Sequence, residues 1–403
     1  MTTPNLLGSQ RVPRFFAVDA AAEGLTPPPV RRPSSMRTYG RSLAGMQKEA
    51  VVVSAASNLA WRLVSDEGPY LDGHDEAPFP LAFLSAGMAA SYTNELVALA
   101  AQRGVALDEL VVTVDNRYTM NGSALRGTMT GGALAPEVRV TTSTPASTRL
   151  RALAADALDA SPLNGMLRAR HDSRFTLSLD GRALVPDRVE ALDAEVVGPH
   201  AADATPRPVG AEPDEPLVRR VTAAEQRQGV EGGKGSSLQA EQQRTLHVEA
   251  RCTLGADEVK TIDVALHSPL GSSFRFRSEE ARGSHDPGAP DAATLVSAGI
   301  AFCFMTQFGR YAAITRERLG GYAVIQDLHL SAGGASGHTG RAGEADPVET
   351  HVHLQGTDEA FARRLVDMGE QTCFLHALCR TALKPRLMIG SVPVTAETDR
   401  SAV

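Results

Sequence analysis

The sequence predicts an α+β protein that contains two tandem copies of one domain, with mixed sheets packed against long buried helices. The first indication is an internal repeat, because residues 85–92 (SAGMAASY) reappear as residues 297–304 (SAGIAFCF) at an offset of 297 − 85 = 212. The second is that this offset also relates Pro78 to Pro290, Glu67 to Glu279, Val140 to Val352, Leu167 to Cys379 and Arg174 to Arg386. The third is that strand-like and helix-like segments follow one order in both copies.

In the first copy, strand-like runs at 50–57 and 59–65 are rich in β-branched and aromatic residues. A loop of Gly, His, Asp and Pro follows, and after it comes a long apolar segment that predicts a buried helix at 81–101. The remaining expected elements are strands at 109–120 and 137–144, a second helix at 147–167 and a final strand at 174–179.

The second copy repeats this order with one more strand at its start. The expected elements are strands at 245–254, 261–268 and 272–278, a helix at 292–316, strands at 322–332 and 348–356, a second helix at 358–383 and a final strand at 386–389.

Composition shifts divide the chain into four segments. We expect an N-terminal tail or surface arm at 1–35, a first domain at 36–190, a linker at 191–242 and a second domain at 243–395. The tail is rich in Pro, and in the linker Pro, Gly and charged residues displace apolar ones, so neither favours regular structure.

The composition is that of an ordinary soluble protein, with 42% hydrophobic and 22% charged residues. A formal net charge of −7 gives no general attraction to nucleic acid or anionic lipid, so neither is expected as a partner. The start of the chain lacks the features of a secretory signal, and the apolar stretch 294–308 is shorter than a membrane span. Four cysteines are too few for a disulfide scaffold in 403 residues, so a cytoplasmic location is expected.

The two copies differ at a pair of cysteines. Cys303, in the long apolar helix, and Cys373, in the second helix, correspond at the repeat offset to Ser91 and Ser161. Taken singly, each is best interpreted as a small apolar core residue. Taken together, the exchanges preserve size and remove thiol chemistry, which predicts that such chemistry belongs to the second copy.

The remaining cysteines and a pair of histidines are better interpreted as structural residues than as catalytic or metal-binding ones. Cys252 and Cys379 are expected to be core residues. His351 and His353 alternate on one strand face, a geometry that metals use, but no third ligand of clear spacing accompanies them. No metal site is therefore predicted.

The sequence around Cys303 resembles the OsmC/Ohr superfamily, the osmotically inducible and organic-hydroperoxide-resistance proteins. In that family a helix that begins near a Pro and reads like LxAAGxAxCF carries the peroxidatic cysteine, and a second helix carries the resolving cysteine. Gly299 stands four residues before Cys303, as the family glycine does, and Cys373 follows after 373 − 303 = 70 residues. The resemblance covers most of residues 45–190 and 243–392.

The resemblance implies a thiol peroxidase that reduces organic hydroperoxides, with Cys303 as peroxidatic and Cys373 as resolving cysteine. An external thiol reductant or dithiol protein would reduce the resulting disulfide, and no cofactor is implied. The family also uses an activating Arg from the strands before the helix. Arg275, Arg277 and Arg282 lie in the comparable region, and pairing with Glu279 or Glu280 at the surface is the alternative for each.

Two features depart from the family pattern, and one further residue near Cys373 is a candidate for the site. Ala293 stands where the family has the Glu that holds the activating Arg, and Asp291 lies two residues earlier. Cys373 is followed by Phe374, where the family has Pro. His376, three residues after Cys373, is a candidate base or thiolate partner, with a histidine at the helix surface as the alternative.

Family members are typically intertwined homodimers, so the resemblance implies that the two copies form an intrachain pseudo-dimer, with further homodimerisation left open. Three function hypotheses remain at this stage. The chain is a thiol-dependent organic hydroperoxide reductase, a repurposed thiol enzyme that acts on a specialised small molecule, or a non-catalytic binding or scaffold protein with buried cysteines.

Overall fold

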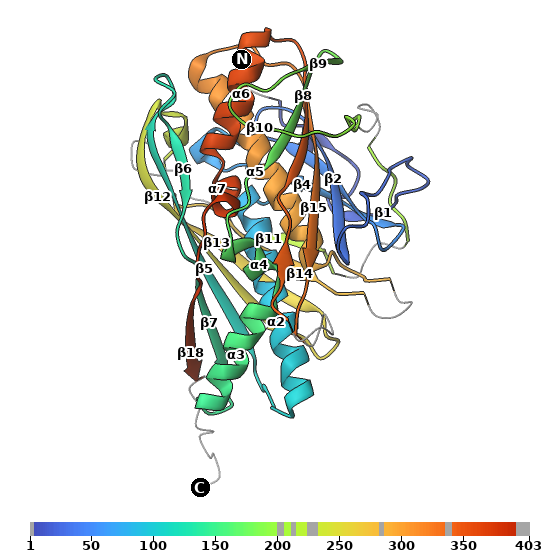
Figure 1. Ribbon diagram of the computed structural model, residues 1–403, viewed down its shortest axis with the longest axis vertical. Helices are drawn as coiled ribbons and strands as arrows, with labels where there is room; N and C mark the ends of the chain where they lie inside the picture. Colours follow the sequence, from blue (N-terminus) through green and yellow to red (C-terminus); the bar gives the residue numbers. More distant parts are fainter. Residues whose placement is uncertain are drawn as a thin grey trace, which may run out of the picture.

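The computed structural model of the 403-residue chain describes residues 4–199, 205–210, 215–223, 233–281, 286–334 and 341–391. Arg282, parts of the expected linker and the last residues expected in the second domain lie outside this set. Within it, two mixed β-sheets enclose a pair of long helices (Figure 1).

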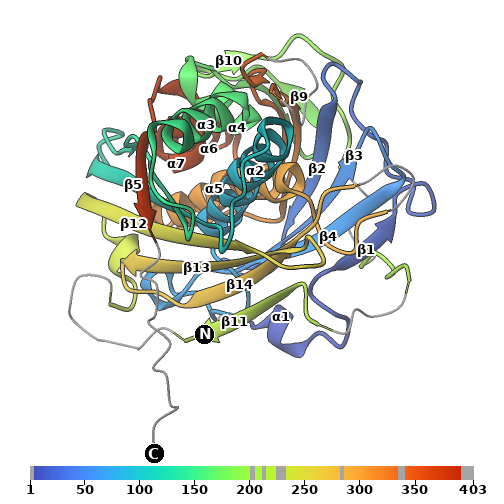
Figure 2. The same ribbon diagram turned by 90° about the horizontal axis from the view of Figure 1, so that it is seen from below.

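The helices of the described residues are α1 (Leu6–Ser9), α2 (Pro80–Arg103), α3 (Thr148–Ala160), α4 (Pro162–Arg168), α5 (Ala292–Thr315), α6 (Glu359–Thr372) and α7 (Phe374–Arg380). Two 3₁₀ turns, η1 (Pro69–Leu71) and η2 (Ser236–Leu238), complete the set. Figure 2 shows α2 and α5 side by side at the centre of the molecule, between the two sheets.

In the described part of the chain, the larger sheet, sheet A, has ten strands. Its order is β1 (Phe16–Asp19), β4 (Leu59–Ser65), β3 (Lys48–Ser54), β2 (Ser34–Ser42), β15 (Tyr322–Ser331), β17 (Glu349–Leu354), β8 (Arg174–Leu179) and β10 (Glu190–Ala191), with β16 (Glu344–Ala345) on β15 and β9 (Arg182–Leu184) on β8.

The other sheet, sheet B, has eight strands. Its order is β11 (Val218–Thr222), β14 (Ser273–Ser278), β13 (Lys260–Ser268), β12 (Glu241–Leu254), β5 (Val111–Ser123), β7 (Glu137–Thr142) and β18 (Arg386–Ser391), with β6 (Thr130–Ala133) on β5.

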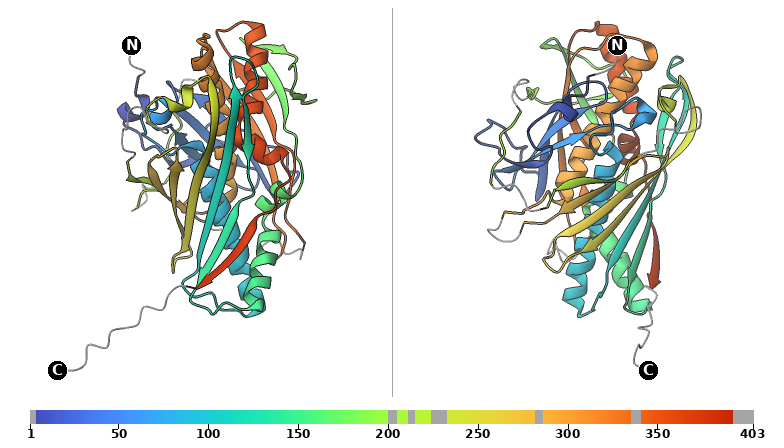
Figure 3. Two further views of the ribbon diagram at one scale, coloured as in Figure 1. Left: turned by 90° about the vertical axis from the view of Figure 1, so that its left-hand side faces the viewer. Right: turned by 180° about the vertical axis from the view of Figure 1, so that it is seen from behind.

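Each sheet contains strands from both halves of the chain. In sheet A, β2 of the first half pairs with β15 of the second, and in sheet B, β12 of the second half pairs with β5 of the first (Figure 3). The pairs β17–β8 and β18–β7 also join the halves and are parallel, whereas the meanders β2–β4 and β12–β14 are antiparallel. The expected α+β class, with mixed sheets and long buried helices, is confirmed.

The bounds of the elements keep the offset of 212 residues found in the sequence. Helix α2 begins at residue 80 and α5 at 292, β7 begins at 137 and β17 at 349, α4 begins at 162 and α7 at 374, and β8 begins at 174 and β18 at 386. The members of each pair also have equal lengths. These four elements therefore recur in the same order in both halves.

The crossing of α2 and α5 depends on two glycines that are equivalent at this offset. A Cβ atom at Gly87 would lie 2.8 Å from the carbonyl oxygen of Ala292, and one at Gly299 would lie 2.7 Å from the backbone nitrogen of Leu84. Because real Cβ atoms do not approach backbone so closely, only glycine permits this contact. Helix α5 is long and apolar enough to span a membrane by composition alone, but 89% of its most apolar window is buried inside the protein.

Several segments differ from the elements that the sequence predicts. Within the expected tail, β1 forms an edge strand on β4, and within the expected linker, β11 forms an edge strand on β14. Both are too short to give a clear strand pattern in the sequence. In addition, each expected second helix is two helices, because the extended backbone of Ser161 separates α3 from α4 and that of Cys373 separates α6 from α7.

Candidate active site

Cys303 and Cys373 lie in contact in the protein interior. Cys303 is in the middle of α5, Cys373 is at the junction of α6 and α7, and their Sγ atoms are 3.4 Å apart. Both thiols are free, and their residues are 2% and 0% exposed. Because bonded sulfurs are about 2.0 Å apart, a disulfide requires them to approach by about 1.4 Å.

The break between α6 and α7 places Cys373 beside Cys303. Cys373 has an extended backbone conformation, and its Sγ accepts a hydrogen bond from the backbone N–H of His376 at 3.5 Å. Strand β6 packs against this junction so closely that a Cβ atom at Gly131 would lie 2.5 Å from the carbonyl oxygen of Thr372. Arg380 donates to the carbonyl oxygen of Gly131 at 3.1 Å. Tertiary packing thus accompanies the break where the sequence has no proline.

The first half repeats this junction with hydroxyls in place of thiols. Ser161 caps α4 by accepting from the backbone N–H of Leu163 at 3.2 Å, and Pro162 begins the helix. A Cβ atom at Gly343, in the second half, would lie 2.2 Å from the carbonyl oxygen of Ser161, just as one at its repeat equivalent Gly131, in the first half, would meet the junction of α6 and α7. The hydroxyl oxygens of Ser91 and Ser161 are 2.8 Å apart. The serines therefore preserve the contact without thiol chemistry.

A narrow pocket of about 40 Å³, partly open to solvent, reaches Cys303. Both halves of the chain line it. The lining residues of the first half are Glu67, Tyr70, Leu71, Phe79, Pro80 and Leu81, and those of the second are Ser237, Arg244, Leu246, Leu266, Cys303, Thr306, Gln307, Arg310 and Phe374. Most of the lining is apolar, and the polar groups gather around Cys303 and the following turns of α5.

Glu67 is the carboxylate of this pocket. It accepts hydrogen bonds from the hydroxyls of Thr306 and Tyr70, each at 2.8 Å, and burial raises its pKa. The buried Lys48 donates to the carbonyl oxygen of Met46 at 2.5 Å. Burial lowers the pKa of Lys48, while Glu67 and the Cys303 thiolate act in the opposite direction. An ammonium at Lys48 would therefore favour a thiolate at Cys303.

Arg310 lies two helical turns beyond Cys303 on α5 and is 3% exposed. Its Nε donates to the carbonyl oxygen of Ser237 at 2.8 Å, and its Nη1 is 3.4 Å from the amide oxygen of Gln307. Burial and the neighbouring Arg244 lower the pKa of Arg310 to about 9. Its Nη2 has no hydrogen-bond partner among the described residues.

The two thiols have different acidities in the reduced pair. Burial, hydrogen bonding with Cys373 and the charge of Glu67 raise the pKa of Cys303. Burial also raises the pKa of Cys373, but hydrogen bonding from Cys303, together with the charge and backbone N–H of His376, outweighs burial and brings that pKa below its usual value. The reduced pair thus favours a thiolate on Cys373, with Cys303 as the hydrogen-bond donor.

His376 is buried, with 1% exposure, and is not at a helix surface. Its ring packs against Phe304 and Phe175, with centroids 4.7 Å and 5.6 Å away. Its backbone N–H donates a hydrogen bond to Cys373, and its ring also acts to lower the pKa of that thiol. The ring Nε2 lies 3.4 Å from the amide nitrogen of Gln326.

The structure does not bring the candidate arginines to the thiols. Arg275 and Arg277 alternate on β14 with buried phenylalanines and lie on the outer face of sheet B. Arg275 pairs with Asp263 at 2.7 Å, and Arg277 pairs with Glu215 at 3.2 Å. Both arginines are thus paired at the surface, as the alternative expected, but their partners are Asp263 and Glu215 and not Glu279 or Glu280. Arg282 lies outside the described residues.

The start of α5 likewise does not supply the pocket acid. Ala293 carries no acid, and Asp291 is the helix cap, where its carboxylate accepts from the backbone N–H of Thr294 at 2.7 Å. Glu67, which lines the pocket, comes instead from the other half of the chain.

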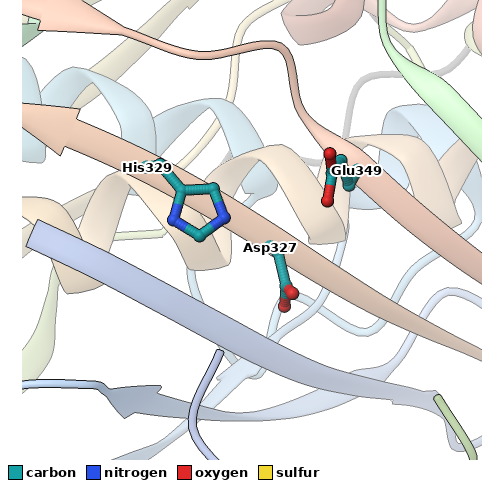
Figure 4. A group of neighbouring side chains, drawn as sticks. All are labelled: Asp327, His329 and Glu349. Atoms are coloured by element: carbon teal, nitrogen blue, oxygen red, sulfur yellow. The ribbon is translucent and has the colours of Figure 1, made fainter. Parts of the chain in front are cut away.

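A second cluster of chemically capable side chains lies on the outer face of sheet A. Figure 4 shows Asp327 and His329 of β15 with Glu349 of β17, and their nearest ligand atoms lie within 4.8 Å of one another. However, Asp327 accepts two hydrogen bonds from Arg37, each at 2.7 Å, and Glu349 accepts one from Arg31 at 2.6 Å. Because guanidinium groups already balance both carboxylates, we do not assign a metal centre here.

Sequence reasoning missed Lys48, a buried charge that acts on Glu67 and Cys303, as well as the pocket residues Glu67 and Arg310. The first two come from the half without the thiols, and no local pattern connects them to Cys303. Arg310 had a visible signal, since it is a charged residue in an otherwise apolar helix, seven residues after Cys303.

Comparisons with known proteins give little similarity. No family model matches the chain, and no curated protein matches it. Among solved structures, an OsmC-like hydroperoxide resistance protein from Jannaschia sp. CCS1 is similar over 31% of this chain and 79% of its own, with 22% identity and a TM-score of 0.18. At that level of likeness, a function has to be inferred from the chain's own residues.

Proposed function

We propose that the chain is a thiol-dependent organic hydroperoxide reductase, with Cys303 as peroxidatic and Cys373 as resolving cysteine. The observation that carries this proposal is the 3.4 Å separation of the two sulfurs, with Cys303 in the wall of the pocket. A thiol pair at this distance can pass between reduced and disulfide forms with little movement. The family resemblance of the sequence around Cys303 agrees with this chemistry.

The proposed cycle begins when the proton shared by the pair resides on Cys373, leaving a thiolate on Cys303. This thiolate attacks one oxygen of the hydroperoxide, the O–O bond breaks, and Cys303 becomes a sulfenic acid. The departing alkoxide takes the proton of Cys373 and leaves as an alcohol. The Cys373 thiolate then attacks the sulfenic sulfur, and the displaced hydroxide takes a proton from Lys48 to leave as water.

An external dithiol completes the cycle. Its two electrons reduce the disulfide to the two thiols, while the reductant itself is oxidised to a disulfide. Overall, one hydroperoxide and one dithiol yield one alcohol, one water and one disulfide of the reductant. This cycle requires no cofactor, and we place it in the cytoplasm, where dithiol reductants are maintained.

The first half contributes to catalysis through Lys48 and Glu67. In the low dielectric of the pocket, an ammonium at Lys48 stabilises the thiolate of Cys303, while Glu67 holds Thr306 and Tyr70 in place through two hydrogen bonds. Since both halves line the pocket and strands of both halves form each sheet, we further propose that the chain is an intrachain pseudo-dimer.

A repurposed thiol enzyme is the second candidate. The observations that favour it are Ala293 at the position of the family glutamate and Arg310, a buried cation in the pocket. In that case Cys303 would attack an electrophile other than a hydroperoxide.

The test is to treat the reduced protein with cumene hydroperoxide and to map disulfides by peptide mass spectrometry, with Cys303→Ser and Cys373→Ser variants in parallel. The proposal expects a bond between Cys303 and Cys373, and turnover when dithiothreitol is supplied. Cys373→Ser should accumulate a sulfenic acid at Cys303, while Cys252 and Cys379 stay reduced as internal controls. A reactive Cys303 without turnover supports the repurposed enzyme, and two inert thiols support a non-catalytic protein.

A further inference from the structure

We infer that the pocket contains an anion subsite at Arg310, and that the preferred substrate is a compact organic hydroperoxide that also carries a carboxylate. That the substrate is a hydroperoxide rests on the proposed function. The subsite itself rests on the contacts of Arg310.

The guanidinium of Arg310 is only partly satisfied by the protein. Two of its nitrogens contact neutral acceptors, which are the carbonyl oxygen of Ser237 at 2.8 Å and the amide oxygen of Gln307 at 3.4 Å. A further contact, to the sulfur of Met120 at 3.7 Å, is weak. The remaining nitrogen, Nη2, is buried and has no partner among the described residues. A buried donor without an acceptor is uncommon in folded proteins and indicates a missing partner.

The missing partner is negatively charged. Arg310 lies near another cation, Arg244, which also lines the pocket and lowers the pKa of Arg310. The pocket carboxylate, Glu67, acts on Arg310 through space, but its oxygens accept from Tyr70 and Thr306 and form no ion pair with Arg310. A carboxylate can pair with a guanidinium through two parallel hydrogen bonds, so it would satisfy Nη2 and balance the charge.

The position of Arg310 defines the size of the ligand. Seven residues separate it from Cys303 on α5, which brings both side chains to nearly the same helix face with a rise of about 10 Å. Since helical side chains lean toward the N-terminus, the Arg310 side chain shortens this gap. Leu81, Leu246 and Phe374 are among the apolar lining residues. These features suit a short apolar body with a hydroperoxide at one end and an anion at the other.

The repeat supplies an independent observation. At the offset of 212, Arg310 corresponds to Ala98 and Cys303 to Ser91. The buried cation is therefore present in the half that has the thiols and absent at the equivalent place in the half that lacks them. Both exchanges fall on the same face of the long helix, which associates the cation with the reacting thiol.

The experiment compares cumene hydroperoxide with its para-carboxylate, which has the same reacting centre and one added charge. For the wild-type protein we expect kcat/KM to be about tenfold higher or more for the carboxylate, the size of effect that a charge-assisted hydrogen bond produces. In Arg310→Met this ratio should fall to about one or below, and in Arg310→Lys it should be partly retained. Arg103→Met, which removes an exposed arginine at the end of α2, is the matched control and should keep the wild-type ratio.

A binding measurement that needs no turnover separates this inference from the proposed function. We expect 4-isopropylbenzoate to protect Cys303 of the reduced protein from iodoacetamide, and 4-isopropylbenzyl alcohol to protect it far less. The difference should vanish in Arg310→Met. Protection that depends on Arg310, without reduction of either hydroperoxide, would support the subsite and overturn the peroxidase. Turnover of both hydroperoxides at equal rates, with no protection by the benzoate, would overturn the subsite and leave the peroxidase standing.

Discussion

Oxidation of Cys303 and Cys373 to a disulfide is expected to stabilise the fold by about 4 kcal/mol at 25 °C. The bond would join residues 373 − 303 = 70 positions apart, and the magnitude is the loop-closure entropy that such a link removes from the unfolded chain. The folded state needs little rearrangement, because the sulfurs already lie 3.4 Å apart. Most of the loop entropy should therefore appear as added stability.

The measurement is urea unfolding of the protein in fully reduced form and after oxidation with diamide. For a chain of this length we take a urea m-value of about 4 kcal/mol/M, so the midpoint should rise by about 1 M on oxidation. Cys373→Ser, treated identically, should show no rise. Equal midpoints for the two wild-type forms, or the same rise in Cys373→Ser, would refute the assignment of this pair as the redox unit.

Three more predictions concern the pocket and its repeat. The double variant Ser91→Cys/Ser161→Cys should form a second disulfide on oxidation, because the hydroxyls are already 2.8 Å apart; titration of the oxidised proteins should show one free thiol fewer in the double variant than in either single variant, although the double variant contains one more cysteine. Glu67→Gln should lower the pKa of Cys303, since the Glu67 charge raises it. The pH midpoint of iodoacetamide alkylation at Cys303 should therefore fall, and an unchanged midpoint would contradict the electrostatic effect of Glu67 on this thiol. Gly131→Ala should destabilise the fold by about 1 to 3 kcal/mol, because the new Cβ would meet backbone at the helix junction; an unchanged urea midpoint would show that the strand can move away.

The sequence was informative where the signals are local. Apolar segments predicted α2 and α5 to within a residue or two of their observed bounds, and the repeat aligned Cys303 with Ser91. These predictions succeed because the apolar character of a helix can be read from one short segment, and a repeat can be found by comparing two such segments directly.

Long-range structure was not predictable in the same way. Nothing local specifies that β2 pairs with β15, or that β12 pairs with β5, since strand pairing between distant segments depends on the whole fold. The end of α6 at Cys373 was also missed, because Phe374 is an ordinary helix residue and the contacts come from Gly131 on β6.

The candidate arginines show a different limit. Arg275 and Arg277 were selected by their place along the chain, but their alternation with Phe274 and Phe276 already indicated which face of the strand would be buried. The larger side chains occupy the core face, so the arginines face outward. The alternation of polar and apolar residues along β14 predicted the location of these arginines better than their alignment with the family pattern did.

The mixing of both halves in each sheet bears on how the Cys303–Cys373 pair and its counterpart, Ser91–Ser161, can change. In an assembly of identical subunits, every substitution occurs twice, so a mutation that removes one thiol removes its symmetry mate as well. Here a substitution changes only one of the two equivalent positions. The covalent connection also keeps the two halves together at any protein concentration. A chain of this kind can keep Cys303 and Cys373 on one side and carry Ser91 and Ser161 on the other. A symmetric homodimer has no genetic route to that combination.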